Sequence, residues 1–150
     1  MVTTSTARQT KAIASDLAKK IVVLPSSHAR VIALKGNLGA GKTTFVQGFA
    51  KALGVSDTVQ SPTFVLMKIY AVKKKHIRHL VHIDAYRIES LAEMKHIGLS
   101  HLLQDKDAII LIEWADRIKK IIPKNAVWVT LEHGKTMTER SIAIKNIDER

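Results

Sequence analysis

The sequence predicts a single α/β domain with a mixed central sheet flanked by helices. Two observations favour this fold class: strand and helix patterns alternate in the first half of the chain, and strand patterns predominate towards its end. A length of 150 residues is enough for one domain with a hydrophobic core. We therefore expect residues 1–150 to form one domain, with about residues 1–8 as a flexible N-terminus.

A glycine-rich segment, GNLGAGKT at residues 36–43, fits the phosphate-binding loop pattern G-x-x-x-x-G-K-[ST] at every fixed position. It follows the apolar run 31–34 and precedes a helical pattern over 44–53, so the helix N-terminus would face a bound anion. Lys42 would reach the β- and γ-phosphates, and the Thr43 hydroxyl would complete a Mg²⁺ shell. The alternative is a glycine-rich turn that binds nothing, but the flanking strand and helix are the context that the motif requires. The sequence thus predicts a P-loop NTPase-like domain that binds a nucleoside triphosphate.

The chain is strongly basic, with 24 lysines and arginines against 13 acidic residues and a net charge of +11. This charge favours a polyanionic partner such as RNA, or an acidic protein surface, and a merely solvated lysine-rich surface is the alternative. Without cysteine the chain has neither disulfides nor a thiolate metal site. No apolar run approaches the roughly 20 residues of a membrane span, so we expect no membrane contact and a cytoplasmic location.

The elements around the loop follow from periodicity and from residues that break helices. Residues 9–21 have apolar side chains at helical spacing, and Pro25–Ser27 ends that helix before the first strand. Residues 64–70 and 79–83 read as two strands, joined by the charged reversal Lys73–His76. We expect them to pair as a hairpin with the lysines on the exposed turn.

The second half of the chain begins with a helix that starts at a capping box, Ser90-x-x-Glu93. A continuous apolar run, Ala-Ile-Ile-Leu-Ile, is typical of a strand that is buried on both faces. In order, we expect a helix over residues 90–96, a helical turn over 99–103, the buried strand over 108–112, an amphipathic piece over 118–122, and closing strands over 126–131 and 141–147.

Two carboxylates stand directly after predicted strands, Asp84 and Glu113. In an open α/β sheet, ligands bind beyond the carboxyl ends of the strands, where the phosphate loop also lies. Nucleotide hydrolysis needs an acid near the metal and a group that orients the attacking water, which these residues could supply. Alternatively, each acid caps a strand or pairs with Arg87 or Arg117. Trp114 either packs on the nucleotide or fills the core.

The absence of two sequence motifs bears on the base of the nucleotide. The chain has no N-K-x-D motif for guanine, and no glycine follows Asp84 as it would in a D-x-x-G motif. We therefore expect ATP rather than GTP. The seven histidines have no metal-ligand spacing, so we interpret them as surface or strand residues.

Four segments carry a resemblance to a known family. Residues 36–45, 61–64, 82–87 and 112–117 read GNLGAGKTTF, SPTF, HIDAYR and IEWADR. In this order they resemble the signatures of the TsaE family, also called YjeE, over about residues 6–145. The family consists of small bacterial ATPases of the tRNA threonylcarbamoyladenosine pathway. One departure is Ala85, which stands where the family usually has leucine.

The resemblance implies partners and residue roles. The partners are the TsaD and TsaB subunits, which place a threonylcarbamoyl group on the adenosine beside the tRNA anticodon, and ATP hydrolysis would reset that complex. Mg²⁺ would be ligated by Thr43 and Glu113, Asp84 would be essential for hydrolysis, Trp114 would lie near the nucleotide, and Ser61–Thr63 would be a nucleotide-sensitive switch. The phosphates would be bound by Gly39, Ala40, Gly41, Lys42, Thr43 and Thr44.

Taken together, we expect a weak Mg²⁺-dependent ATPase that its partners stimulate, with Lys42, Asp84 and Glu113 as catalytic residues. The activity would be weak because no arginine finger or water-positioning glutamine is evident. One alternative is a small-molecule kinase, although the basic turn Lys73–Arg78 lies in a hairpin and would make a poor lid. The other is a basic, non-catalytic RNA-binding accessory module. Under the main interpretation, any tRNA contact would come through the assembled complex with TsaD and TsaB.

Overall fold

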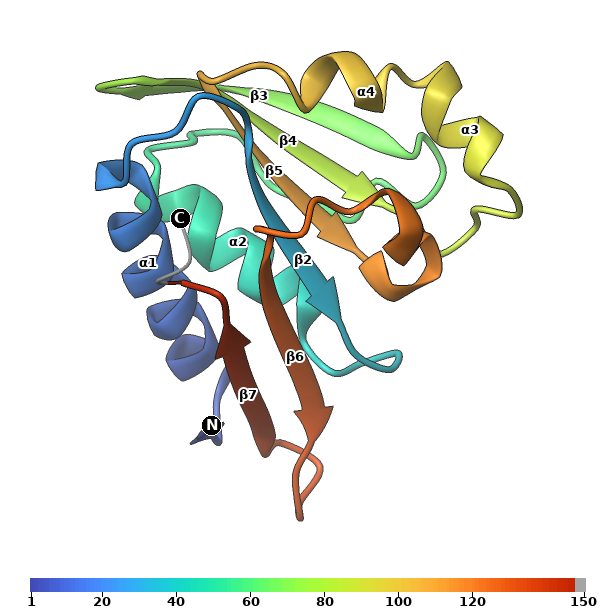
Figure 1. Ribbon diagram of the computed structural model, residues 1–150. Coiled ribbons are helices and arrows are strands. Elements are labelled where there is room, and N and C mark those ends of the chain that lie inside the picture. Colours follow the sequence, from blue (N-terminus) through green and yellow to red (C-terminus); the bar gives the residue numbers. More distant parts are fainter. Residues whose placement is uncertain (148–150) are drawn as a thin grey trace.

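A seven-stranded mixed sheet with the order β1-β7-β6-β2-β5-β4-β3 forms the centre of the protein, shown as a computed structural model in Figure 1. The structure describes residues 1–147. Strands β4, β5, β2 and β6 are mutually parallel, whereas β3, β7 and β1 pair antiparallel at the two sides. The strands are β1 (Val2–Thr4), β2 (Arg30–Lys35), β3 (Met67–Lys74), β4 (Ile77–Asp84), β5 (Ala108–Glu113), β6 (Val127–His133) and β7 (Arg140–Lys145). The mixed α/β sheet predicted from the sequence is confirmed.

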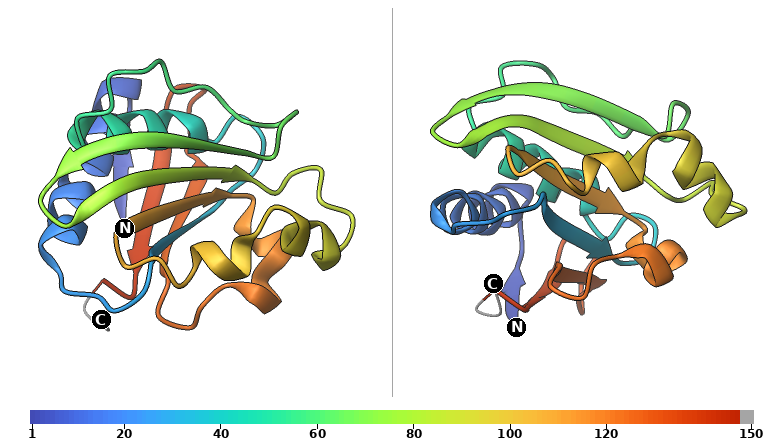
Figure 2. Two further views of the ribbon diagram at one scale, coloured as in Figure 1. Left: turned by 90° about the horizontal axis from the view of Figure 1, so that it is seen from above. Right: turned by 45° about the horizontal axis from the view of Figure 1, so that its top comes forward.

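Helices cover both faces of this sheet, as the two views of Figure 2 show. They are α1 (Ala7–Val23), α2 (Lys42–Ala52), α3 (Leu91–His96), α4 (Leu99–Leu102) and the 3₁₀ helix η1 (Ala115–Ile121). On one face, Ile32 and Leu34 of β2 pack with α1 and α2. On the other face, Val31 and Ala33 pack with α3, α4 and η1. Because successive side chains of a strand point to opposite faces, the four central residues of β2, Val31 to Leu34, are all apolar and buried.

The N-terminus differs from the expectation of a flexible segment over residues 1–8. Strand β1 pairs with β7, and the buried Thr4 hydroxyl lies 3.0 Å from that of Thr10 in α1. Helix α1 begins two residues earlier than predicted, because a capping box between Thr6 and Gln9 fixes its first turn. It also ends two residues later than predicted, at Val23.

The β3–β4 hairpin is confirmed, but its first strand begins at Met67 rather than at Phe64. Leu66 has a φ of 64°, in the left-handed region, which interrupts an extended strand at that point. The reversal is narrower than predicted and is centred on Lys75 and His76, so the two preceding lysines belong to β3.

The second half of the chain largely follows the prediction. All six residues of β5 are buried, and the Ser90–Glu93 capping box at α3 is formed. The predicted amphipathic piece begins earlier, at Ala115, and it is a 3₁₀ helix that directly follows β5 and Trp114. The closing strands β6 and β7 are present with bounds shifted by one or two residues. In the described part of the chain, no helix is both long and apolar enough to span a bilayer.

Candidate functional site

The glycine-rich loop leaves the end of β2 and enters α2 at Lys42. Gly41 precedes the helix with a φ of 100°, a backbone conformation that residues other than glycine rarely adopt. A Cβ atom at Gly36 would overlap the carbonyl oxygen of Leu131 in β6, so the loop can lie this close to the sheet only with glycine there. The strand–loop–helix arrangement predicted from the sequence is therefore present, with the backbone of the loop at the N-terminus of α2.

Lys42 is buried within its own loop. Its Nζ atom donates hydrogen bonds to the carbonyl oxygens of Gly36 at 2.7 Å and Asn37 at 2.8 Å, and it lies 4.0 Å from the ring centroid of Trp114. Burial lowers the pKa of Lys42, and the nearby carboxylates of Glu113 and Asp84 partly oppose this effect. The ammonium group thus has neutral hydrogen-bond acceptors, and an anionic ligand would stabilise its charge further.

Thr43 and Glu113 meet at the mouth of the loop. The Thr43 hydroxyl donates to Oε1 of Glu113 at 2.9 Å, and Glu113 is buried at the end of β5. The neighbouring strand β4 ends in register, with Asp84 beside Glu113. The two predicted acids are thus brought together with the phosphate loop at one edge of the sheet.

Asp84 organises the segment that precedes β3. Its Oδ2 atom accepts hydrogen bonds from the hydroxyls of Ser61 at 2.8 Å and Thr63 at 2.9 Å, and its Oδ1 atom accepts one from the backbone N–H of Tyr86 at 2.9 Å. Asp84 is buried, while Phe64, directly after this segment, is 86% exposed. The carboxylate therefore ties the hydroxyls of Ser61 and Thr63 to the site.

The alternative that these acids pair with arginines does not hold within residues 1–147. Arg87 lies over the ring of Phe64 at 4.8 Å, and Arg117 lies over the ring of Tyr86 at 5.9 Å. The ion pairs formed by the described residues are Arg78–Asp107, His79–Asp105 and His82–Glu113. Within the part of the chain that the structure describes, neither acid is thus neutralised by an arginine.

A cavity of about 440 Å³ lies over the loop and the two acids. Trp114 packs partly against the core, and it also lines this cavity beside Tyr86, whose ring centroid is 4.8 Å away. Contact between Trp114 and a nucleotide stays a prediction. Ala40 has no exposed surface, so its side chain does not reach the cavity. The lining residues are Leu38, Gly39, Gly41, Lys42, Thr43, Thr44, Ser61, Thr63, Asp84, Tyr86, Glu113 and Trp114.

A second cavity of about 270 Å³ adjoins the first, since Gly39, Gly41 and Thr44 line both. Its other walls come from the N-terminus of α1 and from the β6–β7 turn, and they are formed by Ser5, Thr6, Ala7, Thr10, Met137, Thr138 and Arg140. Sequence patterns gave no indication of this cavity, because its walls come from three distant parts of the chain, and the pairing of β1 with β7 joins two of them.

The protein side chains suit Mg²⁺ only in part. In residues 1–147, no group of three or more histidine, cysteine or acidic side chains is arranged to hold a metal. A cation at this place would take the Thr43 hydroxyl and the Glu113 carboxylate from the protein, and the remaining ligands from water and a phosphate. This mixed shell is typical of Mg²⁺, so the residues present fit a Mg²⁺–nucleotide complex.

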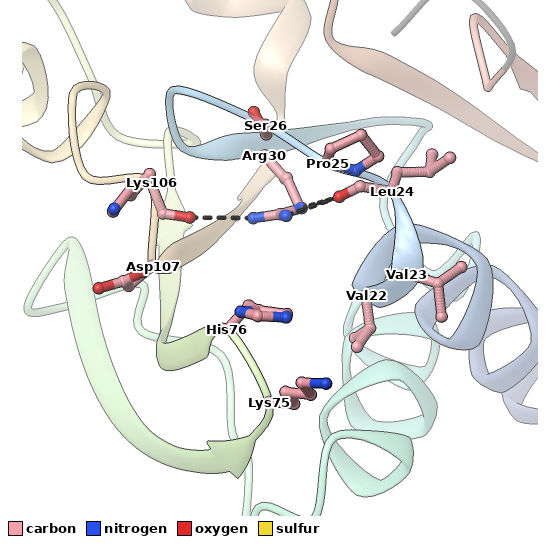
Figure 3. A pocket seen from close by; sticks show the side chains of 10 residues that line it. All are labelled: Val22, Val23, Leu24, Pro25, Ser26, Arg30, Lys75, His76, Lys106 and Asp107. Atoms are coloured by element: carbon pink, nitrogen blue, oxygen red, sulfur yellow. Dashed lines mark hydrogen bonds between the residues drawn. The ribbon is translucent and has the colours of Figure 1, made fainter.

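A further cavity, of about 520 Å³, lies at the opposite edge of the sheet, beside the β3–β4 turn (Figure 3). The buried Arg30 side chain crosses it and donates hydrogen bonds to the carbonyl oxygens of Leu24 and Lys106. These contacts join the C-terminal end of α1 to the start of β5. Burial lowers the pKa of Arg30, partly opposed by Asp107. We interpret this arginine as a structural clamp, because backbone carbonyls occupy its donors.

Two residues of the site had been given no role from the sequence. His82 is fully buried and lies 2.6 Å from Glu113, although the histidines had been interpreted only as surface or strand residues. Tyr86 lines the main cavity. Alternation along β4 could have indicated His82, because residues two apart on a strand share a face and Asp84 is two positions away.

Comparison with known proteins places these features in a family. The model of the family described as "Threonylcarbamoyl adenosine biosynthesis protein TsaE" matches residues 4–142. The Bacillus subtilis protein named tRNA threonylcarbamoyladenosine biosynthesis protein TsaE is 34% identical over 142 residues, which are 95% of this chain and 82% of that protein. Its namesake from Borreliella burgdorferi is 36% identical over 104 residues, 69% and 73% of the two chains.

Comparison with solved structures supports the same family. The crystal structure of Bacillus subtilis YdiB superposes with a TM-score of 0.76 and 29% sequence identity, and the match covers 99% of this chain and 85% of that one. The family match spans the phosphate loop, both acids and the Ser61–Thr63 segment. On sequence, fold and site together, this chain belongs to the TsaE family.

Proposed function

We propose that this protein binds ATP with Mg²⁺ at the phosphate loop, hydrolyses it slowly, and thereby supports threonylcarbamoyladenosine modification of tRNA together with TsaD and TsaB. The observation that carries the proposal is the meeting of the Thr43 hydroxyl and the Glu113 carboxylate beside the buried Lys42. The names of its relatives support the pathway. Because tRNA is the substrate there, we expect the protein to work in the cytoplasm.

Phosphate binding would give the Lys42 ammonium group new hydrogen-bond acceptors. Lys42 now donates to two carbonyl oxygens of its own loop, and these neutral acceptors are weaker partners for an ammonium group than phosphate oxygens are. The backbone N–H groups of Gly39 to Thr44 would surround the β-phosphate at the start of α2. Lys42 would then turn from the loop carbonyls to the β- and γ-phosphates.

Thr43 and Glu113 would hold the metal on the γ-phosphate side of the loop. Bound Mg²⁺ neutralises charge on the phosphate oxygens during transfer. The present hydrogen bond holds the Thr43 and Glu113 oxygens 2.9 Å apart, so little rearrangement of the protein would be needed to bring both to one cation.

Asp84 would orient the water that attacks the γ-phosphate. Its carboxylate lines the same cavity as Lys42 and Thr43, and no arginine among residues 1–147 pairs with it. Its contacts with Ser61 and Thr63 give the nucleotide a way to act on that segment, because a water that donates a hydrogen bond to Asp84 competes with these two hydroxyls. We therefore expect Ser61–Thr63 to respond to nucleotide.

The nucleoside would occupy the second cavity, which continues from the loop towards the β6–β7 turn. Thr138 offers a hydroxyl group there, and Met137 offers an apolar surface for the base. Because the chain lacks the N-K-x-D motif that recognises guanine, we expect adenine.

The site formed by the described residues lacks a group that fast hydrolysis would need, and the partners would supply it. Arg87 and Arg117 rest on aromatic rings rather than in the cavity, so no arginine of the described chain stands ready to stabilise charge in the transition state. The TsaD–TsaB assembly would complete the site or order the Ser61–Thr63 segment. The kinase alternative has little support, since the basic Lys73–Arg78 turn lies beside the cavity at the opposite edge of the sheet.

Steady-state ATP hydrolysis by the purified chain, alone and with TsaD and TsaB, tests the proposal. We expect slow release of inorganic phosphate alone and faster release with the two subunits, together with formation of threonylcarbamoyladenosine on tRNA over repeated turnovers. Fast hydrolysis that does not respond to the subunits would contradict the proposed role. Transfer of phosphate to a small molecule instead of water would favour a kinase.

A further inference from the structure

His82 lies near the end of β4, and its side chain is completely buried. Its Nε2 atom is 2.6 Å from Oε2 of Glu113. The other carboxylate oxygen, Oε1, accepts the hydrogen bond from Thr43 at 2.9 Å. The Glu113 carboxylate is thus held at both oxygens, on one side by the neighbouring strand and on the other by the phosphate-loop helix.

Packing alone does not account for a histidine at this position. On the same face of β4, Leu80 belongs to the core formed with α1 and α2, and an apolar side chain at position 82 would extend that core. Within residues 1–147, the Nδ1 atom of His82 has no hydrogen-bond partner. A buried polar atom without a partner lowers stability. The contact with Glu113 is therefore the feature that distinguishes histidine from leucine here.

Glutamate is a flexible ligand unless a neighbour fixes it. Its side chain has three rotatable bonds, and the Thr43 hydroxyl, one of its two partners here, is itself a proposed ligand of the cation. The remaining partner, His82, lies behind the carboxylate and does not line the cavity. Partners behind a metal ligand orient it, and their loss commonly weakens metal binding by about 10- to 100-fold.

We propose that His82 is a positioning residue for the cation site. By binding one carboxylate oxygen of Glu113, it keeps the other directed at Thr43, so that both protein ligands are arranged before nucleotide and metal arrive. The inference rests on the proposed function of this site. It assigns His82 a role in metal binding without placing it in contact with metal or nucleotide.

Three variants separate positioning from space filling. His82→Gln keeps an N–H donor that can reach the place of Nε2, whereas His82→Asn has the same amide but is one methylene too short. His82→Leu fills a similar volume without any donor. For each variant, the measurement is the Mg²⁺ concentration that gives half-maximal thermal stabilisation by a non-hydrolysable ATP analogue, with affinity for the analogue in EDTA as the control.

We expect His82→Leu and His82→Asn to raise this Mg²⁺ concentration by about 10- to 100-fold, and His82→Gln to restore most of the loss. Affinity in EDTA should stay at the wild-type level in all three, because the phosphate loop is unchanged. In crystals of nucleotide-free His82→Asn, we expect Glu113 to have turned away from Thr43.

Several results would overturn the inference. These are wild-type Mg²⁺ dependence in His82→Asn, equal losses in His82→Asn and His82→Gln, or an unchanged Thr43–Glu113 contact in the His82→Asn crystals. If His82→Leu does not fold, the Asn and Gln pair decides, since the two side chains differ by one methylene. Wild-type protein that binds the analogue equally well with Mg²⁺ and with EDTA would refute the proposed metal site itself, and this inference with it.

Discussion

The Thr43 hydroxyl lies 2.9 Å from Oε1 of Glu113, although the two residues are 70 positions apart in the chain. The contact follows from the sheet: β2 and β5 are adjacent and parallel, with Leu34 beside Glu113, and the phosphate loop begins where β2 ends. A helix that starts at Lys42 therefore presents Thr43 to the end of β5. The proposed Mg²⁺ site depends on this contact between Thr43 and Glu113.

Replacing Lys42 by alanine should weaken binding of ATP by roughly 10- to 100-fold, because a charge-assisted hydrogen bond to the phosphates is lost. The fold should remain intact, since the lysine side chain contributes a buried charge with only neutral acceptors. Isothermal titration calorimetry measures the affinity, and thermal unfolding checks the fold. Lys51→Ala, at an exposed position near the other end of α2, is the matched control. Equal affinities of the folded Lys42 variant and wild type would exclude phosphate binding by this lysine.

Nucleotide affinity should depend on pH through the same lysine. Burial lowers the pKa of Lys42, so the free protein loses the ammonium charge at a lower pH than an exposed lysine does. Affinity for ATP should accordingly be full at neutral pH and decline as the alkaline range is entered. In Lys42→Arg the guanidinium stays charged, so the decline should disappear, whatever the absolute affinity. The same alkaline decline in both proteins would assign it to another group.

Glu113→Gln should reduce the Mg²⁺ dependence of ATP binding far more than it changes affinity in EDTA. The amide keeps the size of the carboxylate but carries no charge for the cation. Titrations of ATP at fixed Mg²⁺ concentrations measure this difference, and Glu132→Gln, at an exposed position on β6, is the control. Unaltered Mg²⁺ dependence in Glu113→Gln would move the metal-ligand role to Asp84.

Asp84→Asn should bind ATP at close to wild-type affinity and hydrolyse it at least about 100-fold more slowly, because a group that orients the attacking water is lost. Single-turnover hydrolysis separates this effect from binding. Asp16→Asn, at an exposed position on α1 away from the cavity, is the control. A loss of affinity that fully accounts for the loss of rate would mean that Asp84 only supports the fold or the nucleotide.

Much of the fold and site could be predicted because the signals are local. The phosphate loop is a contiguous motif, and the continuous apolar run of β5 indicates a strand buried on both faces, which puts the following Glu113 at the ligand edge of the sheet. The order of these patterns along the chain was enough to predict that Asp84 and Glu113 lie beside the loop.

What could not be predicted depends on distant contacts. Strand β1 has only three residues, and its pairing with β7 decides its conformation. Phe64 and Val65 have strong strand propensity but are exposed before β3 begins, because the left-handed Leu66 interrupts the strand. The sequence around His82 is that of an ordinary strand, and only the pairing of β4 with β5 places its side chain beside Glu113.

A crystal structure with Mg²⁺ and a non-hydrolysable ATP analogue is the most direct test of the central claim. We expect Mg²⁺ to contact the Thr43 hydroxyl and the Glu113 carboxylate, and Lys42 to have left the carbonyl oxygens of Gly36 and Asn37 for the phosphates. A nucleotide bound elsewhere, or a metal from which both Thr43 and Glu113 are turned away, would contradict the account.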